Sequence, residues 1–169
     1  MAVYTQVSDG ALAAFLDEYD LGSPRAFKGI AEGVENSNYY LETDQGRFIL
    51  TLFERRADPK DLPYFINLKR HLARNDYPCP APVAGKDGEA LRQLEGRPAV
   101  IVTFLDGLSP RRPNASQCRS LGAGLARMHL ALEDFDEVRP NALGPASWPG
   151  LWKGRSATAD DLQDGLANL

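Results

Sequence analysis

The sequence predicts an α+β fold in which a five-stranded antiparallel sheet, with one helix inserted after its third strand, precedes a linker and further helices. Short turns at residues 44–46 and 95–96 separate segments with the apolar patterns of strands. An amphipathic segment at residues 58–75 stands between the third and the fourth strand. A nearly continuous apolar run, PAVIVTF at residues 98–104, is typical of a central, buried strand.

A helix and three strands are predicted in the first third of the chain. Ser8 is a suitable N-cap for the helix, because its hydroxyl can accept a backbone N–H of the first turn, and Gly22 ends the segment. Strands are predicted at residues 25–30, 37–43 and 47–54. The apolar positions share one face of the helix (Leu12, Phe15, Leu16, Tyr19) and one face of the third strand (Phe48, Leu50, Leu52).

The inserted helix opens at Asp58, which precedes a proline suited to a first helical turn, and closes at Asn75. Its apolar stripe contains Leu62, Phe65, Ile66, Leu72 and Ala73. The proline-rich segment YPCPAP is an extended connector to two more strands, predicted at residues 90–94 and 97–104.

A linker with the sequence LDGLSPRRPN follows, and Asn114 with Gln117 forms a capping box for the next helix. We predict an irregular stretch at residues 141–154 and a last helix that begins at Thr158. The apolar stripe of the capped helix contains Leu121, Leu125, Met128 and Leu132.

Composition and charge exclude several classes of protein. The 169 residues are 43% hydrophobic and 25% charged, which is a globular balance. A net charge of -4 without a basic run argues against a nucleic-acid surface. No apolar stretch is long enough to span a membrane and the amino terminus lacks the pattern of a signal peptide, so we expect a cytoplasmic protein. The two cysteines and the two histidines lack metal-ligand spacing, and no metal site is predicted.

A polar, glycine-containing segment joins the first two strands. Gly29 and Gly33 would let the backbone approach phosphates, and the short polar side chains of Asn36, Ser37 and Asn38 lie beside them. Two glycines between strands are more often simply part of an ordinary turn. Neither the Walker A motif nor the G-x-G-x-x-G motif occurs in the chain.

Five segments carry a family resemblance: GVENSNYYLET, GRFILTLFE, DLPYFINLKRHLA, YPCPAPV and AVIVTFLDG. With SLGAGLARMHLA and RPNALGPASW after them in order, the chain resembles the homoserine kinases of the aminoglycoside phosphotransferase and choline kinase superfamily. The resemblance implies a protein-kinase-like fold with a nucleotide-binding lobe at residues 1–105, and a hinge with the start of a helical lobe at residues 106–169. It also implies transfer of the ATP γ-phosphoryl group to L-homoserine, a step of threonine biosynthesis, with ATP and Mg²⁺.

The same resemblance assigns roles to single residues. The segment from Gly29 to Asn38, including Gly33, Asn36 and Ser37, covers the phosphates. Thr51 stands where kinases place a phosphate-binding lysine, which excludes the usual ion pair between that lysine and an acid on the helix, here Asp61. The residues Phe104, Leu105 and Asp106 form the hinge that binds adenine.

The family's catalytic loop, H-G-D-x-x-x-x-N, does not occur in this sequence, because Leu72 follows His71 and Leu130 follows His129. We therefore expect the catalytic residues to lie C-terminal to Leu169, in a longer enzyme of which this chain is an inactive amino-terminal fragment. The apolar stripe of the helix after Asn114 would then be exposed. A related kinase for choline or an amino sugar, and a non-catalytic protein that binds a nucleotide or a partner, are the alternatives.

Overall fold

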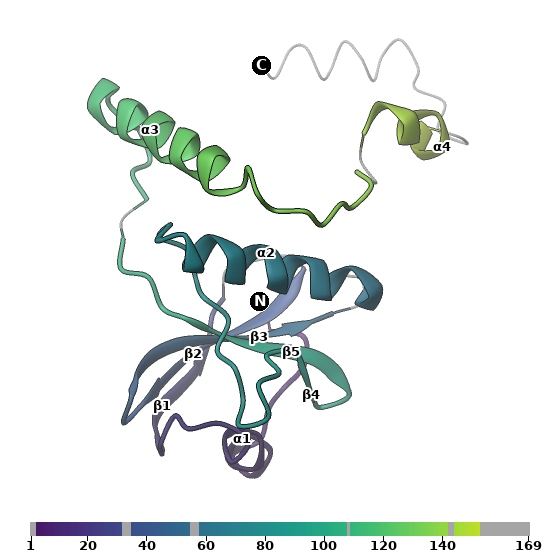
Figure 1. Cartoon of the computed structure of the whole chain (residues 1–169). Helices are drawn as coiled ribbons and strands as arrows, with labels where there is room; N and C mark the ends of the chain where they lie inside the picture. Colours follow the sequence, from purple (N-terminus) through teal and green to yellow (C-terminus); the bar gives the residue numbers. More distant parts are fainter. Residues whose placement is uncertain (1–2, 32–34, 55–57, 108, 142–143, 153–169) are drawn as a thin grey trace, which may run out of the picture. The chain divides into compact units, whose positions relative to one another are not determined.

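The computed structural model describes residues 3–31, 35–54, 58–107, 109–141 and 144–152 of this chain. Within them the helices and strands follow the predicted order (Figure 1). The helices are α1 (Asp9–Leu16), α2 (Leu62–Arg74), α3 (Ala115–Ala131) and α4 (Trp148–Trp152), with short 3-10 turns η1 (Pro59–Asp61) and η2 (Pro145–Ser147). The strands are β1 (Pro24–Gly29), β2 (Asn36–Thr43), β3 (Gly46–Phe53), β4 (Arg92–Leu94) and β5 (Arg97–Thr103).

The strands form one antiparallel sheet in the order β1-β2-β3-β5-β4, and α2 is inserted between β3 and β4. This arrangement confirms the predicted five-stranded sheet. The two-residue turn between β4 and β5 has positive φ at both Glu95 (51°) and Gly96 (68°). A hairpin turn of this type needs left-handed backbone at both central positions, which glycine adopts without a steric penalty.

Two elements, α1 and β4, are shorter in the structure than the sequence pattern predicts. Helix α1 ends at Leu16, and Tyr19 lies in a following turn in which its N–H donates to the Leu16 carbonyl oxygen (2.9 Å). Strand β4 begins at Arg92 and not at residue 90, because Ala90 packs with Ile66 and the residues of β5 next to α2. In both places a buried apolar residue continues the pattern after the regular backbone has ended.

The prediction of an irregular stretch at residues 141–154 is wrong where the structure has η2 and α4. Pro145 occupies the first turn of η2, a position in which the missing N–H of proline has no intrahelical partner to lose. The helix predicted from Thr158 lies outside the described residues.

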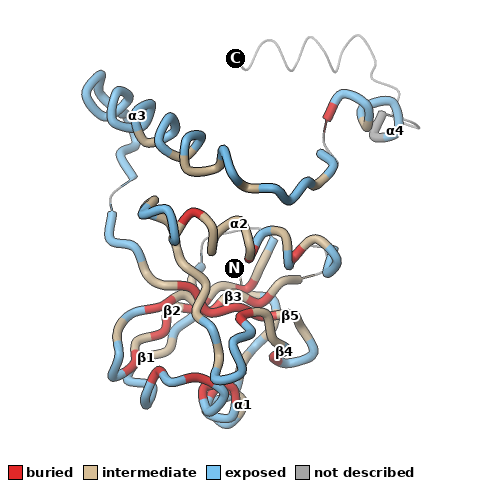
Figure 2. Tube along the Cα trace, in the orientation of Figure 1, coloured by how far each residue is buried: buried red, intermediate tan, exposed pale blue. Residues whose placement is uncertain are grey.

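The sheet is covered differently on its two faces. Figure 1 shows α1 on one side of the sheet and α2 on the other. The side of α1 holds the larger buried cluster, in which Leu12, Phe15 and Leu16 pack against Leu41 and Leu50. On the side of α2, a smaller cluster joins Ile66 to β5. Figure 2 shows the resulting concentration of buried residues in α1 and the central strands.

The chain divides into two compact units, Met1–Glu137 and Val138–Leu169. Helix α3 belongs to the first unit and begins with the predicted capping box, in which Asn114 and Gln117 exchange two hydrogen bonds of 2.9 Å. No residue of α3 is buried, and the side chain of Leu121 is 75% exposed. The lobe boundary predicted at residues 105/106 falls inside the first unit and stays a prediction about the longer enzyme.

Candidate functional site

The face of the sheet opposite α1 carries the residues with candidate functions. Successive side chains of a strand point to opposite faces, and the burial of β2 and β3 alternates accordingly. The register pairs three residues of β2 with three of β3 on this face: Asn38 with Thr51, Tyr40 with Ile49, and Glu42 with Arg47. These pairs form a continuous row that extends about 13 Å from Thr51 to Arg47, given about 3.3 Å per residue.

At one end of the row, the side chains of Asn38 and Thr51 bind each other. The Thr51 hydroxyl donates to Asn38 Oδ1 at 2.8 Å, and both residues are half-buried. This bond leaves the amide N–H groups of Asn38 and the hydroxyl oxygen of Thr51 for other contacts. The structure therefore brings together two residues that the sequence assigned to nucleotide binding, and the neutral Thr51 stands where kinases usually place a charged lysine.

Ser37 precedes Asn38 in β2 and pairs with Leu52 of β3, and its side chain points to the other face of the sheet. It is fully buried. Its Oγ accepts the backbone N–H groups of Tyr4 (2.8 Å) and Thr5 (3.0 Å) and donates to Glu54 Oε1 (2.7 Å). The hydroxyl thus holds the amino-terminal arm, residues 3–7, against the sheet. A contact of the Ser37 backbone with phosphates stays a prediction.

The amino-terminal arm also explains the glycine at the end of β1. A Cβ atom on Gly29 would lie 2.7 Å from Cγ2 of Val3, so a side chain there would displace the arm. Gly33 lies outside the described residues, and Asn36 opens β2, half-buried, opposite Phe53. Asp61 lies where η1 joins α2.

The predicted hinge follows β5 at the opposite end of the row. The Phe104 N–H donates to the Arg47 carbonyl oxygen (3.1 Å), so this amide already has a partner inside the chain. The Phe104 ring makes an edge-to-face contact with Tyr40 at 5.8 Å between centroids. Leu105 is 46% exposed, and the Asp106 carboxylate accepts two hydrogen bonds from Arg47 (2.8 and 3.1 Å).

Neighbouring charges shift the pKa values of two residues at this end. Hydrogen bonds to Asp106 raise the pKa of Arg47, and the hydrogen bond from the Tyr40 hydroxyl to Glu42 raises the pKa of Tyr40. Arg47 therefore stays cationic and Tyr40 neutral at ordinary pH. Sequence reasoning did not single out either residue, because Arg47 and Asp106 are 59 positions apart and no local pattern links them.

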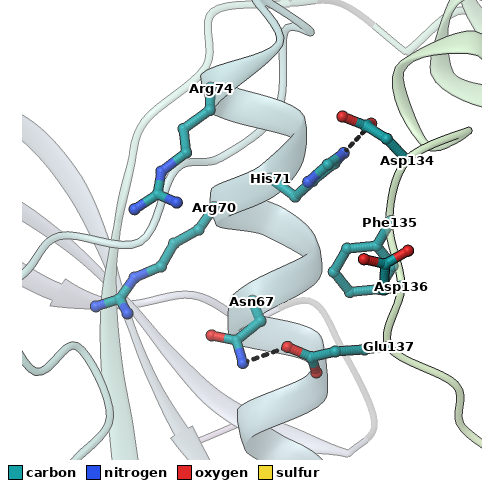
Figure 3. A pocket seen from close by; sticks show the side chains of 8 residues that line it. All are labelled: Asn67, Arg70, His71, Arg74, Asp134, Phe135, Asp136 and Glu137. Carbon is teal, nitrogen blue, oxygen red and sulfur yellow. Dashed lines mark hydrogen bonds and ion pairs between the residues drawn. The ribbon is translucent and has the colours of Figure 1, made fainter.

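A pocket of about 470 Å³ lies where the segment after α3 passes α2, away from the row on the sheet face (Figure 3). His71 Nε2 lies 2.9 Å from the Ala131 carbonyl oxygen and 3.0 Å from Asp134 Oδ1, and Asn67 donates to Glu137 Oε1 (2.8 Å). Arg70 and Arg74 point away from His71 in this view. The hydrogen bonds attach the end of α3 to α2, and they give His71 a structural role.

Neither location fits a magnesium ion. In the part of the chain that the structure describes, no group of three or more His, Cys, Asp or Glu side chains lies close enough to hold a metal. Mg²⁺ prefers near-octahedral oxygen ligands, including one or two carboxylates. No chemical step of this chain is therefore assigned to a bound metal. Among the described residues there is also no helix long and apolar enough to cross a membrane.

Residues 26–168 match the phosphotransferase enzyme family, APH. The chain is 72% identical to the homoserine kinase of Hyphomonas neptunium and 57% identical to that of Acidiphilium cryptum, each over 166 residues. These matches cover 98% of this chain but 51% and 52% of the relatives. The chain thus spans about half the length of the curated relatives it matches.

Two solved structures share the fold. A spectinomycin phosphotransferase, crystallised with ADP and spectinomycin, has a TM-score of 0.65 and 11% identity over 92% of this chain and 50% of its own. An aminoglycoside phosphotransferase from Alicyclobacillus acidocaldarius has a TM-score of 0.59 and 14% identity over 94% of this chain and 48% of its own. Likeness at these identities concerns the fold alone, and it confirms the predicted protein-kinase-like architecture.

Proposed function

We propose, since this chain belongs to the phosphotransferase enzyme family, that it is the nucleotide-binding half of a homoserine kinase. The complete enzyme would transfer the γ-phosphoryl group of ATP to the hydroxyl oxygen of L-homoserine, releasing ADP. The choice of homoserine over choline or an amino sugar rests on the relatives of 72% and 57% identity, which are named homoserine kinases.

One observation supports the place of the nucleotide. The linker after β5 and the pair of Asn38 and Thr51 lie at the two ends of a single row on one sheet face. An adenine at the linker and phosphates at the pair would make ATP lie along β3. The Asn38 amide would donate to a phosphate oxygen, and Thr51 would hold that amide in place through its hydrogen bond.

Such a site binds and orients ATP but supplies little transition-state stabilisation by itself. Phosphoryl transfer depends on positioning and on the neutralisation of charge at the phosphoryl oxygens. The residues at the proposed phosphate end are neutral, and the sequence has no H-G-D-x-x-x-x-N loop. We infer that the acid–base and metal-binding groups belong to the other half of the enzyme.

The test joins the 169 residues of this chain to the remaining half of the Hyphomonas neptunium homoserine kinase. We expect the chimera to form ADP only when ATP and homoserine are both present, and the 169-residue chain alone to form none. Homoserine-independent ADP formation, or an inactive but folded chimera that fails to bind ADP, would contradict the proposal.

A pair of isosteric substitutions in the chimera tests the nucleotide face itself. Thr51→Val removes the hydrogen bond to Asn38 and should raise the KM for ATP about fivefold, the effect of losing about 1 kcal/mol of binding. Thr43→Val is the matched control, because Thr43 lies on the same strand pair but on the buried, opposite face. An equal KM for ATP in both variants would mean that the phosphates of ATP do not bind at Asn38 and Thr51.

A further inference from the structure

Arg47 of β3 contacts the start of the linker that follows β5 at two residues, Phe104 and Asp106. Arg47 donates two nearly parallel hydrogen bonds to the Asp106 carboxylate, from Nη1 (3.1 Å) and Nη2 (2.8 Å). Its guanidinium carbon lies 5.0 Å from the centroid of the Phe104 ring, and its carbonyl oxygen accepts the Phe104 N–H. Arg47 thus contacts the linker through backbone, ring and carboxylate.

These contacts restrict the start of the linker at two points, Phe104 and Asp106. The backbone hydrogen bond continues the ladder between β3 and β5 by one residue, and the ring contacts with Arg47 and Tyr40 fix the side chain of Phe104. Two residues later, the paired hydrogen bonds of a planar guanidinium set both the distance and the orientation of the Asp106 carboxylate. Leu105, which is 46% exposed, lies between these two attached residues.

The backbone groups between these points remain available for a ligand. Among the described residues, no hydrogen bond involves the backbone N–H of Leu105 or of Asp106. The amide of Phe104, by contrast, is already bonded to Arg47. A planar base with donors and acceptors on one edge, such as adenine, is the kind of group that such an edge of backbone recognises.

We propose that Arg47 is a positioning residue, which fixes the linker at Phe104 and Asp106 so that the backbone between them is preorganised to recognise the adenine base. The inference rests on the proposed nucleotide site. The ion pair is mostly solvent-exposed, with 47% and 76% of the two side chains accessible, so its effect on overall stability is small. Its effect on a local, flexible segment is larger, because it removes conformations that would otherwise have to be lost on binding.

The test compares Arg47→Ala and Arg47→Lys with the wild-type 169-residue chain. Arg47→Lys keeps the charge but lacks the paired hydrogen bonds. Arg25→Ala is the matched control, because Arg25 forms an exposed ion pair with Asp44 (2.6 Å) on the same sheet, far from the linker in sequence. Hydrogen exchange of the peptide 103–107 reports the linker directly, and titrations with ADP and GDP report base recognition.

We expect about tenfold faster exchange of the Phe104 amide, which donates to the Arg47 carbonyl oxygen, in Arg47→Ala, and an intermediate effect in Arg47→Lys. The preference for ADP over GDP should fall about fivefold in Arg47→Ala. A loss of global stability would weaken the binding of ADP and of GDP equally and would leave the ratio of the two affinities unchanged. Asp106→Ala should reproduce the effect, and the double variant should add little to it.

Unchanged exchange and an unchanged ratio in Arg47→Ala would overturn the proposal. If the exchange increases but the ratio does not, Arg47 holds the linker without a role in base recognition, and the proposal is likewise wrong. A wild-type chain that binds neither nucleotide would refute the nucleotide site itself. Hydrogen exchange, which needs no ligand, would then still decide whether Arg47 fixes the linker.

Discussion

At the scale of single residues, Ser37 shows how one buried hydroxyl joins three parts of the chain. It accepts hydrogen bonds from the amino-terminal arm and donates one to Glu54, which in turn pairs with Arg97 of β5 (3.2 Å). The Tyr39 hydroxyl adds a hydrogen bond to the Thr5 carbonyl oxygen (2.5 Å). The sequence predicted Ser37 as a nucleotide-binding residue from its position beside the glycines. Its burial depends on strand register, which only the folded sheet reveals.

Ser37→Ala should lower the free energy of unfolding by about 2–3 kcal/mol, because two backbone N–H groups and one carboxylate lose their partner in a buried place. Urea unfolding of the 169-residue chain measures the change. Ser120→Ala is a control, since the Ser120 hydroxyl bonds only to the Ser116 carbonyl oxygen on the exposed helix α3. Equal effects of the two substitutions would mean that the arm does not contribute to stability.

Tyr19 gives a prediction about alkaline pH. Its side chain is 3% exposed, its hydroxyl has no hydrogen-bond partner among the described residues, and burial raises its pKa to about 12. A folded-state pKa above the usual value of 10 means that the fold favours the neutral phenol. This contribution to stability is fully present below pH 10 and is lost as the pH rises from 10 to 12.

Tyr19→Phe should therefore leave stability at pH 7 nearly unchanged, since no hydrogen bond is lost, and should reduce the loss of stability between pH 10 and pH 12. Urea midpoints of both proteins across this range give the difference. The comparison has to be between the two proteins, because Tyr39 and Tyr40 also have raised pKa values and remain in both. Parallel curves would show that Tyr19 ionises freely in the folded state.

At the scale of elements, helix α3 is attached to the rest of its unit chiefly at its carboxyl end. His71 of α2 contacts the Ala131 carbonyl and Asp134, and the Phe135 ring packs at 5.2 Å from the His71 ring (Figure 3). The donor Asn75 Nδ2 also lies 3.0 Å from His71 Nε2, so this nitrogen is surrounded by two acceptors and one donor. These contacts give His71 a structural role at the junction of α2 with the end of α3.

His71→Ala should release this end of α3. The amides of Leu132, Glu133 and Phe135, which close its last turns, should exchange about tenfold faster, equivalent to ~1.4 kcal/mol of local stability. Arg74→Ala is the matched control, because Arg74 lies about one turn further along α2 and points away from His71 and Asp134 in Figure 3. Exchange that rises equally in both variants would show a general loosening of α2.

The helices and strands could be predicted from the sequence wherever the spacing of the apolar residues and the turn-forming residues indicated the same element. Turn residues and the apolar patterns beside them located β2 and β3, a nearly continuous apolar run located β5, and the capping box located the start of α3. The ends of α1 and β4 were missed because Tyr19 and Ala90 are buried without regular backbone. For the site, the pair of Asn38 and Thr51 followed from the polar segment and the family resemblance, whereas Arg47 depends on a contact between distant residues.

At the scale of the whole molecule, the first unit has a well-packed sheet and a helix, α3, without buried residues. The predicted exposure of its apolar stripe is confirmed at Leu121 (75%) and Leu125 (48%), and Leu130 is 64% exposed as well. Several large apolar side chains on one exposed helix are a typical cause of association between copies of a chain.

We expect the 169-residue chain to self-associate at micromolar concentration. The double substitution Leu121→Glu and Leu125→Glu should shift it toward the monomer without lowering its Tm, because neither leucine is buried. Sedimentation velocity measures association, and Ser120→Glu on the same helix controls for the added charge. A monomeric wild-type chain at these concentrations would contradict the expectation.

The alternation of β2 has a consequence for evolution and engineering. Its odd-numbered residues, such as Ser37 and Tyr39, bind the amino-terminal arm and belong to the face that packs against α1. Its even-numbered residues, such as Asn38 and Tyr40, face the proposed site. The variants of a saturation library over this strand should therefore fall into two groups, according to whether the substituted residue has an odd or an even number. Substitutions at odd positions would reduce the abundance of the protein in cells, and those at even positions would spare abundance and change ligand preference. Designers seeking a new nucleotide specificity can thus vary every second residue of one strand while leaving its neighbours untouched.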